Sequence, residues 1–340
     1  MNKIKVALIT RLFDVKGNAG LGRVATEVRN GLIERGYDVV TMGSKSESLH
    51  GYFKYLFWDI PMHLPQADIY IACTPMESIF LPKEKTISIV HDLIPLLYPD
   101  RAGARMNESA FNRFISQKLF WLGSYNASKC KRIVCNSTMT ENELVKYFNV
   151  NPKKVKQIDL GVRPELDYQP KKDNTFRVGY LGQLDKRKRV DLLINAFKDS
   201  DINGELVIAW SGIERKILEV MADGDKRIKF LGFVPDSSLV DFYNSLDVFA
   251  FPTAVEGFGI PIVEAMACKK PVLVWEDSII PPELKVRCYK KNDHFNQAIL
   301  NNIVKTEKMS SYFNYDYAHS LSWDKFVDGI ELTMQEVMVG

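Results

Sequence analysis

The sequence predicts an α/β protein in which two doubly wound parallel sheets form two successive domains. Short apolar runs rich in β-branched residues alternate with segments of helical periodicity. Most of these runs are continuously apolar, which is typical of strands buried on both faces of a parallel sheet. The pattern occurs twice along 340 residues, a length at which one hydrophobic core usually gives way to two.

The first half of the chain contains five predicted strands. They are residues 5–10, 37–42, 68–73, 86–92 and 132–137. A glycine-rich loop with Gly17, Gly20 and Gly22 follows the first strand and leads into a predicted helix. Glycines let the backbone of such a loop approach a ligand. Their order is not G-x-G-x-x-G and no acidic residue ends the second strand, so the dinucleotide fingerprint is missing.

The second half contains five more predicted strands. They are residues 177–182, 205–210, 227–233, 248–252 and 270–275. Residues 161–175 are polar and contain two prolines, which is typical of a linker between domains. At the C-terminus, a potential N-cap at Ser322 precedes apolar residues at helical spacing, namely Phe326, Ile330, Met334 and Val337. We therefore expect domains at 1–165 and 166–315, with a helix in 316–340 packing back on the first domain.

Composition narrows the class of protein. Hydrophobic residues make up 46% and charged residues 26%, as in soluble globular proteins. The five cysteines are odd in number and form no C-x-x-C pair, which argues against a disulfide or zinc framework and favours the cytoplasm. No stretch is long and apolar enough to cross a membrane, and nucleic-acid-binding motifs are absent.

Charge is distributed unevenly along the chain. Residues 1–165 contain 23 Lys and Arg against 16 Asp and Glu, whereas the remainder is net acidic. The basic charge of the first domain has three interpretations. It binds an anionic substrate, it contacts the anionic inner surface of a membrane, or it forms a solvated face without a partner. All three interpretations stay open at this point.

The segment 252–275 places two glutamates eight positions apart around a glycine turn. Pro252 ends a strand, Pro261 favours a helix start, and Glu264 is expected in the first helical turn. Backbone N–H groups beside a helix N-terminus form an anion site, and a carboxylate can bind a vicinal diol. Alternatively, Glu264 complements the helix dipole and the glycines only make a turn.

Two further sites lie at the ends of predicted strands. Arg187 and Lys188 precede an amphipathic helix, where a cation is favourable only if an anion such as a diphosphate binds nearby; the alternative is a solvated charge run. His91 and Asp92 end the fourth strand, at the sheet edge where ligands bind. The alternatives are a hydrogen-bonded core histidine and an aspartate that caps the following turn.

Residues 256–264, EGFGIPIVE, closely resemble the E-x7-E motif (EGFGxPxxE) of retaining glycosyltransferase family 4. The continuation AMACKKPVLV is also similar, with Lys270 where the family usually has glycine. The resemblance covers nearly the whole chain and is strongest over 176–283. It implies a GT-B fold, in which two Rossmann-like domains face a cleft, with acceptor on the first domain and nucleotide sugar on the second.

The resemblance also implies roles for individual residues. Its His-Asp branch has a histidine that contacts the transferring sugar, and the Arg-Lys pair neutralises the donor diphosphate. The implied catalytic residues are His91, Arg187, Lys188 and Glu256. The implied donor-binding residues are Gly20, Gly22, Gly182, Phe233, Val234, Gly257, Phe258, Gly259, Ile260 and Glu264. The implied acceptor-side residues are Arg23 and Asp92.

By resemblance, the chain moves a sugar from a nucleoside diphosphate to a hydroxyl of a glycan, a lipid-linked acceptor or a small molecule, with retention and without a metal or cofactor. The donor is GDP-mannose, which the His-Asp branch indicates, or a UDP-sugar. The alternative is a non-catalytic nucleotide-sugar-binding subunit.

Residues 49–65 and 111–132 are rich in aromatic residues. In the second segment, the spacing of Phe114, Lys118, Trp121 and Tyr125 is helical, which indicates either packing in the core or contact with a membrane.

Overall fold

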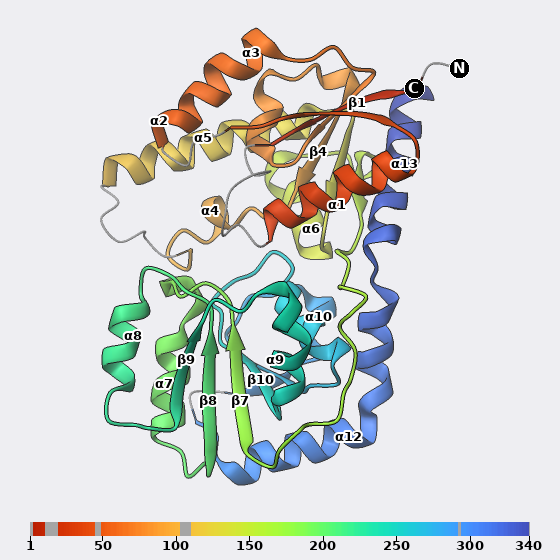
Figure 1. Cartoon of the computed structure of the whole chain (residues 1–340). Helices are drawn as coiled ribbons and strands as arrows, with labels where there is room; N and C mark the ends of the chain where they lie inside the picture. Colours follow the sequence, from red (N-terminus) through yellow and green to blue (C-terminus); the bar gives the residue numbers. More distant parts are fainter. Residues whose placement is uncertain (1–2, 11–19, 45–48, 103–109, 292–293, 340) are drawn as a thin grey trace. The chain divides into compact units, whose positions relative to one another are not determined.

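The structure is a computed structural model that describes residues 3–10, 20–44, 49–102, 110–291 and 294–339 (Figure 1). The chain divides into two compact units. The first comprises Met1–Leu97, Ser109–Gly161 and Trp323–Gly340, and the second comprises Tyr98–Glu108 and Val162–Ser322. The domain boundaries expected near residues 165 and 315 stay a prediction.

The first unit contains a six-stranded parallel sheet in the order β2-β1-β3-β4-β5-β6. The strands are β1 (Lys5–Ile9), β2 (Asp38–Met42), β3 (Ile69–Ala72), β4 (Thr86–Val90), β5 (Arg132–Cys135) and β6 (Val155–Gln157). Every residue of β3 and β4 is buried, as continuous apolar runs predict. All five strands predicted in this half are confirmed.

Helices flank this sheet. They are α1 (Leu21–Glu34), α2 (Leu49–Lys54), the π-helical turn η1 (Tyr55–Asp59), α3 (Ile60–His63), η2 (Pro75–Phe80), η3 (Lys83–Lys85), α4 (Ile94–Leu97), α5 (Ala110–Lys129), α6 (Thr138–Phe148), η4 (Pro152–Lys154) and α13 (Trp323–Val339). The C-terminal helix α13 packs against α1 (Figure 1). A Cβ on Gly31 of α1 would lie 2.8 Å from Val327 of α13, so the two helices meet closely. The prediction that the last helix returns to the N-terminal part of the chain is confirmed.

The second unit contains another six-stranded parallel sheet, in the order β12-β11-β10-β7-β8-β9. Its strands are β7 (Phe176–Leu181), β8 (Gly204–Ala209), β9 (Ile228–Gly232), β10 (Val248–Phe251), β11 (Val272–Trp275) and β12 (Tyr289–Lys291). Its helices are η5 (Lys186–Lys188), α7 (Val190–Lys198), α8 (Arg215–Ala222), η6 (Asp236–Ser238), α9 (Leu239–Ser245), α10 (Ile260–Ala267), α11 (Pro282–Lys285) and α12 (Gln297–Ser320). Helices α7 and α8 lie together on one side of β7–β9, and α9 and α10 lie on the other (Figure 1).

The strand order indicates the edge of the second sheet at which we expect a ligand to bind. Strands β7 and β10 are neighbours although they are far apart in sequence, and the chain leaves them in opposite lateral directions. Ligands of open parallel sheets bind at the carboxyl ends of strands at such a switch point. The segments after β7 and after β10 therefore meet at one edge. Among the described residues, no helix is long and apolar enough to span a membrane.

Candidate functional site

The turn after β7 and the turn after β10 are bonded to each other. The amide of Ala254 donates to the carbonyl of Arg187 at 2.7 Å, and the amide of Glu256 donates to the carbonyl of Ile279 at 2.9 Å. The Asp185 carboxylate accepts from the amide of Lys188 at 3.1 Å and begins the short helix η5. These backbone bonds hold Arg187 and Lys188 of η5 beside the glutamate of the second turn.

The Glu256 carboxylate joins the two cations in one cluster. Its Oε1 accepts from Arg187 Nη1 at 2.5 Å, from Lys188 Nζ at 2.6 Å and from Thr253 Oγ1 at 2.8 Å. The side chains of Lys188 and Glu256 are only 9% and 12% exposed. The structure thus brings together three of the four residues that sequence reasoning named as catalytic.

Charge in this cluster is unbalanced. Burial raises the pKa of Glu256, but the charges of Arg187 and Lys188 outweigh it and hold the pKa at about 2. Burial lowers the pKa of Lys188, an effect that Glu256 opposes and Arg187 reinforces. Glu256 is therefore ionised at neutral pH and is no proton donor there. Arg187 and Lys188 outnumber Glu256 in these ion pairs, and the Asp185 carboxylate also acts on Lys188. The two cations favour an anionic ligand at this site.

The glycine turn leads into α10, and Gly259 is its N-terminal flanking residue. Gly259 has φ of +103°, and a Cβ there would lie 3.0 Å from Ile262 Cδ1. Glycine adopts this backbone conformation at little cost, whereas other residues are strained in it. The backbone of Gly257, Phe258, Gly259 and Ile260 thus approaches the helix N-terminus, where amides and the helix dipole favour an anion.

Glu264 lies deeper in α10 than the sequence predicted. The helix begins at Ile260, so Glu264 is its fifth residue and the first turn contains no acidic residue. The expectation of Glu264 in the first turn is wrong, because the helix starts one residue before Pro261. Glu264 is 5% exposed, its Oε2 accepts from Tyr243 Oη at 2.9 Å, and its Oε1 lies 3.8 Å from Arg163 Nε.

Arg189, which sequence reasoning did not identify, forms hydrogen bonds to the segments next to the cluster. Its backbone has φ of +50°, an uncommon conformation for a residue with a side chain. Its guanidinium donates to the carbonyls of Pro252 and Thr253, to Asp277 Oδ2 and to Ser278 Oγ. Arg189 therefore ties the turn after β7 to the segments after β10 and β11.

Two aromatic rings lie at the ends of β8 and β9. Phe233 is 60% exposed, Val234 is buried, and the Trp210 ring centroid lies 4.8 Å from that of Phe233. Trp210 has φ of +94°, which places a bulky side chain in a strained backbone conformation. Sequence reasoning missed Trp210, although an aromatic residue directly after β8 was a visible signal. At the end of β7, a Cβ on Gly182 would lie 2.9 Å from Tyr180 Oη.

The remaining predicted residues belong to the first unit. His91 follows β4 and is 7% exposed, and its Nε2 lies 2.9 Å from the carbonyl oxygen of Cys73. Burial lowers the pKa of His91 to about 4. The ring is therefore neutral at physiological pH, Nε2–H donates to Cys73, and Nδ1 carries the accepting lone pair.

Asp92 and Asn136, which follow β4 and β5, differ in their hydrogen bonding. Asp92 Oδ1 accepts from the amide of Ile94 at 2.9 Å, which confirms that it caps the following turn. Asn136 follows β5, is 3% exposed, and its Oδ1 has no hydrogen-bond partner within the described part of the chain. A buried acceptor of this kind at the carboxyl edge of a sheet is suited to a ligand hydroxyl. Sequence reasoning did not single it out.

The glycine-rich loop is described in part. Gly17 lies outside the described residues, Gly20 precedes α1, and Gly22 is buried in the first turn of α1. The guanidinium of Arg23 lies 5.3 Å from the ring centroid of Trp323 on α13, and its Nε lies 3.5 Å from Glu27 Oε1. The ligand roles expected for these residues stay predictions.

Comparison with known proteins is consistent with this site. Residues 163–285 match the family model "Glycosyl transferases group 1". The chain is 25% identical over 249 residues to the serotype-specific mannosyltransferase WbdA of Escherichia coli, and this match covers 64% of the chain but only 29% of WbdA. It is 26% identical over 253 residues to the O-antigen chain mannosyltransferase RfbU of Salmonella typhimurium, covering 70% of the chain and 68% of RfbU.

Solved structures agree on the fold. Anabaena HepE, solved in complex with UDP-glucose, superimposes with a TM-score of 0.69 at 17% identity and covers 97% of this chain and 99% of HepE. The two six-stranded parallel sheets flanked by helices are those of the GT-B fold. Residues 163–285 therefore form a region of the group 1 glycosyl transferase type, and the chain has the GT-B fold.

Proposed function

We propose that the protein is a retaining glycosyltransferase that moves a sugar from a nucleoside diphosphate to an acceptor hydroxyl. The observation that carries the proposal is the cluster of Arg187, Lys188 and Glu256 beside the N-terminus of α10. The two cations and the backbone amides are positioned to bind a diphosphate. Charge that develops on the leaving diphosphate is then stabilised by fixed protein groups, which supply what a metal ion supplies elsewhere.

The other residues are proposed to bind the rest of the donor. Phe233, Val234 and Trp210 support the base, and Glu264 binds the ribose diol. Glu256 is ionised, so it orients the sugar and stabilises positive charge at the anomeric carbon. The Nδ1 of His91 accepts a hydrogen bond from a sugar hydroxyl. Arg23 and Asp92 are proposed to act on the acceptor side.

The relatives suggest the substrate class. WbdA and RfbU are mannosyltransferases, and RfbU is named for the O-antigen chain. HepE was solved with UDP-glucose. We propose GDP-mannose or a UDP-sugar as donor and a growing or lipid-linked glycan as acceptor, in polysaccharide synthesis at the cytoplasmic side of the membrane.

Turnover of nucleotide sugars tests this proposal. The protein is incubated with GDP-mannose, UDP-glucose, UDP-galactose and UDP-N-acetylglucosamine, without acceptor and with EDTA, and release of nucleoside diphosphate is measured. We expect slow hydrolysis of one donor that persists in EDTA. A ligand at 100 times its dissociation constant stabilises a protein by about 2.7 kcal/mol, so the preferred nucleotide is also found from thermal shifts.

Two variants separate catalysis from binding. Glu256→Gln is expected to lower turnover by about 100-fold while nucleoside diphosphate affinity is retained, because charge stabilisation at the reaction centre is lost. Lys188→Met is expected to lose both. Nucleotide-sugar binding without hydrolysis or transfer would instead favour the non-catalytic subunit. Full turnover in Glu256→Gln would contradict the role proposed for Glu256.

A further inference from the structure

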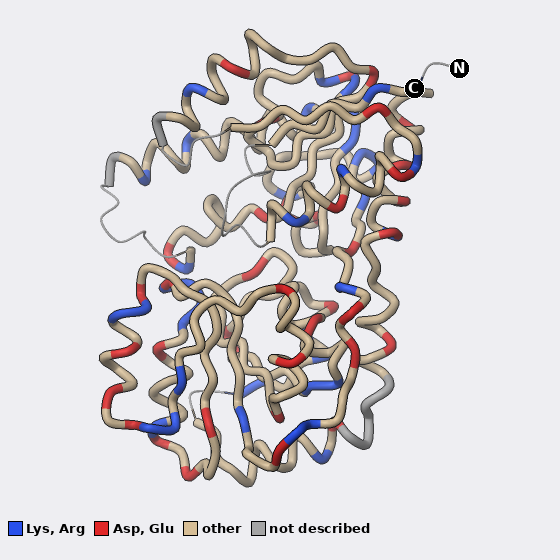
Figure 2. The backbone as a smooth tube through the Cα atoms, viewed as in Figure 1, with Lys and Arg blue, Asp and Glu red and all other residues tan. Residues whose placement is uncertain are grey.

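Glu264 is a charged residue inside the second unit. Helix α10 has the sequence IPIVEAMA, in which Glu264 alone is charged, and its chain neighbours Val263 and Ala265 are fully buried. Glu264 itself is 5% exposed. By contrast, α8 carries charged residues of both signs on the outside of this unit (Figure 2). A buried carboxylate is costly unless other groups bind it, so the partners of Glu264 bear on its role.

Tyr243 of α9 binds one oxygen of this carboxylate. Its Oη donates to Glu264 Oε2 at 2.9 Å, and the tyrosine is fully buried. Its ring packs edge-on against Phe249 and Phe242, with centroid distances of 5.5 Å and 5.4 Å, which fixes the position of the hydroxyl. Burial and the charge of Glu264 raise the pKa of Tyr243 well above its usual 10, so the hydroxyl is a donor at physiological pH.

Arg163 approaches the other oxygen of the same carboxylate. Its Nε lies 3.8 Å from Glu264 Oε1, is buried, and makes no hydrogen bond within the described part of the chain. Its Nη1 is paired with Asp236 Oδ2 at 2.5 Å, which holds the guanidinium in place. The two oxygens of Glu264 therefore differ, because one accepts from a tyrosine hydroxyl and the other lies near a cation.

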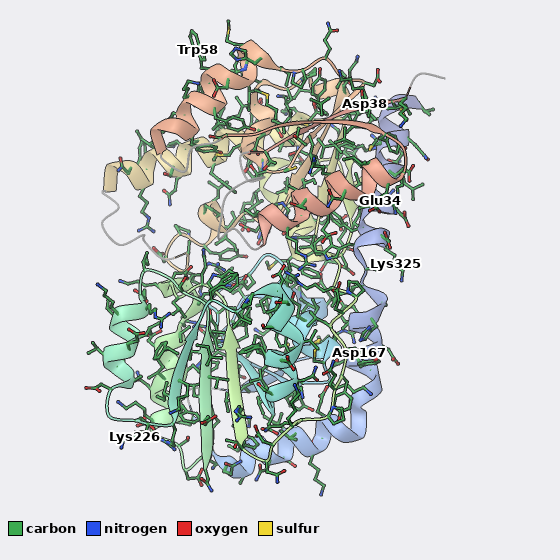
Figure 3. The ribbon with its side chains drawn as sticks, viewed as in Figure 1. Glu34, Asp38, Trp58, Asp167, Lys226 and Lys325 are labelled. Atoms are coloured by element: carbon green, nitrogen blue, oxygen red, sulfur yellow. The ribbon has the colours of Figure 1, made fainter. Side chains whose placement is uncertain are left out.

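The segment that carries Arg163 is fastened to α9 by Asn244. The Asn244 side chain donates to the carbonyl of Asp167 at 2.8 Å. Asp167 also lies beside α12, where its carboxylate accepts from Tyr315 Oη at 2.7 Å (Figure 3). Tyr243 and Asn244 are consecutive residues, so one turn of α9 both supplies the donor to the carboxylate and anchors the segment of Arg163.

We propose that Tyr243 is a positioning residue that orients the Glu264 carboxylate toward a ribose diol, so that the protein selects nucleotides that have this diol. The inference rests on the ribose role proposed above for Glu264. The last torsion of a glutamate is broad, so the side chain alone does not fix the plane of its carboxylate. A diol presents two donors at a fixed spacing and requires a fixed plane. The hydrogen bond from Tyr243 supplies it, and Arg163 supports it from the other oxygen.

Binding of nucleotides with and without the diol tests the proposal on the full chain. Isothermal titration calorimetry measures dissociation constants for GDP, UDP, 2′,3′-dideoxy-GDP and 2′,3′-dideoxy-UDP. We expect the unaltered protein to favour the ribonucleotide by about 10-fold or more, the contribution of a hydrogen bond to a charged group. Tyr243→Phe is expected to reduce this ratio to about threefold or less by weakening the ribonucleotide alone. A purely structural role would weaken both nucleotides equally.

A second variant and a matched control complete the test. Arg163→Met is expected to lower the same ratio by about threefold, the contribution of one ion pair, and it decides the test if Tyr243→Phe does not fold. Tyr55→Phe is the control, because Tyr55 is fully buried in the first unit and its Oη donates to the carbonyl of Met42 at 3.2 Å. It loses the same hydroxyl, and its ratio is expected to match that of the unaltered protein. Circular dichroism and melting temperature establish that each variant is folded.

Glu264→Leu separates failure of this inference from failure of the proposed function. If Glu264→Leu loses the ribose preference while folded Tyr243→Phe and Arg163→Met keep it, the positioning role is wrong and the ribose role of Glu264 stands. If Glu264→Leu also keeps the preference, or the unaltered protein has none, both roles are wrong. Equal weakening of ribonucleotide and dideoxynucleotide by Tyr243→Phe would also overturn the positioning role.

Discussion

Replacing Glu256 by glutamine removes the charge that holds Arg187 and Lys188 together while keeping the shape of the side chain. The folded structure lowers the pKa of Glu256 from its usual 4.5 to about 2, because the charges of Arg187 and Lys188 outweigh the effect of burial. Each pKa unit corresponds to 1.36 kcal/mol, so the ionised carboxylate stabilises the fold by about 3 kcal/mol at neutral pH. Two cations left without this partner are destabilising by a similar amount.

The pH dependence of this contribution has a definite sign. Because the folded pKa lies below the unfolded pKa, the unfolded chain binds the proton more tightly. The contribution is fully present above about pH 4.5 and is lost as the pH falls toward 2. The difference in unfolding free energy between the unaltered protein and Glu256→Gln is therefore constant from neutral pH to about pH 5, and it narrows below that.

Thermal unfolding measures this difference without any assumption about activity. A loss of about 3 kcal/mol lowers the melting temperature by roughly 6–12 °C for a unit of this size. Glu276→Gln is the matched control, because Glu276 is an exposed carboxylate at the end of β11. We also expect a nucleoside diphosphate to raise the melting temperature of Glu256→Gln at least as much as that of the unaltered protein, since its charge replaces the missing carboxylate.

The reasoning is refuted if the melting temperatures of Glu256→Gln and of the control Glu276→Gln both lie within about 1 °C of that of the unaltered protein at pH 7. It is also refuted if the difference between the two proteins grows as the pH falls. Either result means that the buried cations do not depend on this carboxylate.

Three further predictions concern single positions around the two sheets. Gly259→Ala is expected to cost about 1–2 kcal/mol and to weaken nucleoside diphosphate binding, because alanine is strained at φ of +103°; unfolding and calorimetric titration check this, and unchanged affinity would contradict it. Arg189→Gly relieves the strain of a left-handed residue but leaves four acceptors without their donor. A net loss of about 2 kcal/mol of stability is therefore expected in denaturant unfolding, and a gain in stability would contradict it. The imidazole C–H signals of His91 are expected not to titrate between about pH 5.5 and 8 by NMR, because burial keeps the pKa near 4; a midpoint near 6.5 would contradict this.

The inner strands were predictable because burial on both faces leaves a continuous apolar run, whereas the edge strands β2 and β9 are partly exposed but five residues long. All ten predicted strands are confirmed, including β4, whose five residues are all buried. The two strands that sequence reasoning missed, β6 and β12, are three residues long, lie at sheet edges and are only partly buried. A strand of only three residues contributes too few apolar residues to be told from a loop.

The cluster at the second sheet was predictable because residues after neighbouring parallel strands meet at one edge, and its spacing resembled a known motif. Arg189 was missed because a left-handed backbone conformation leaves no mark in the sequence when the residue is not glycine. Trp210 was missed although its place directly after β8 could have been noticed. The aromatic residues of α5 were ambiguous because helical spacing shows which residues share a face but not whether that face is covered. Phe114, Trp121 and Tyr125 are 56%, 50% and 43% exposed, so the expectation that they pack in the core is wrong.

A crystal structure of the protein with a bound nucleoside diphosphate tests the central claim most directly. We predict that the diphosphate oxygens contact the side chains of Arg187 and Lys188 and the backbone amides of residues 257–260, with the base against Phe233. Diphosphate density remote from the carboxyl ends of β7 and β10 would contradict the proposed function.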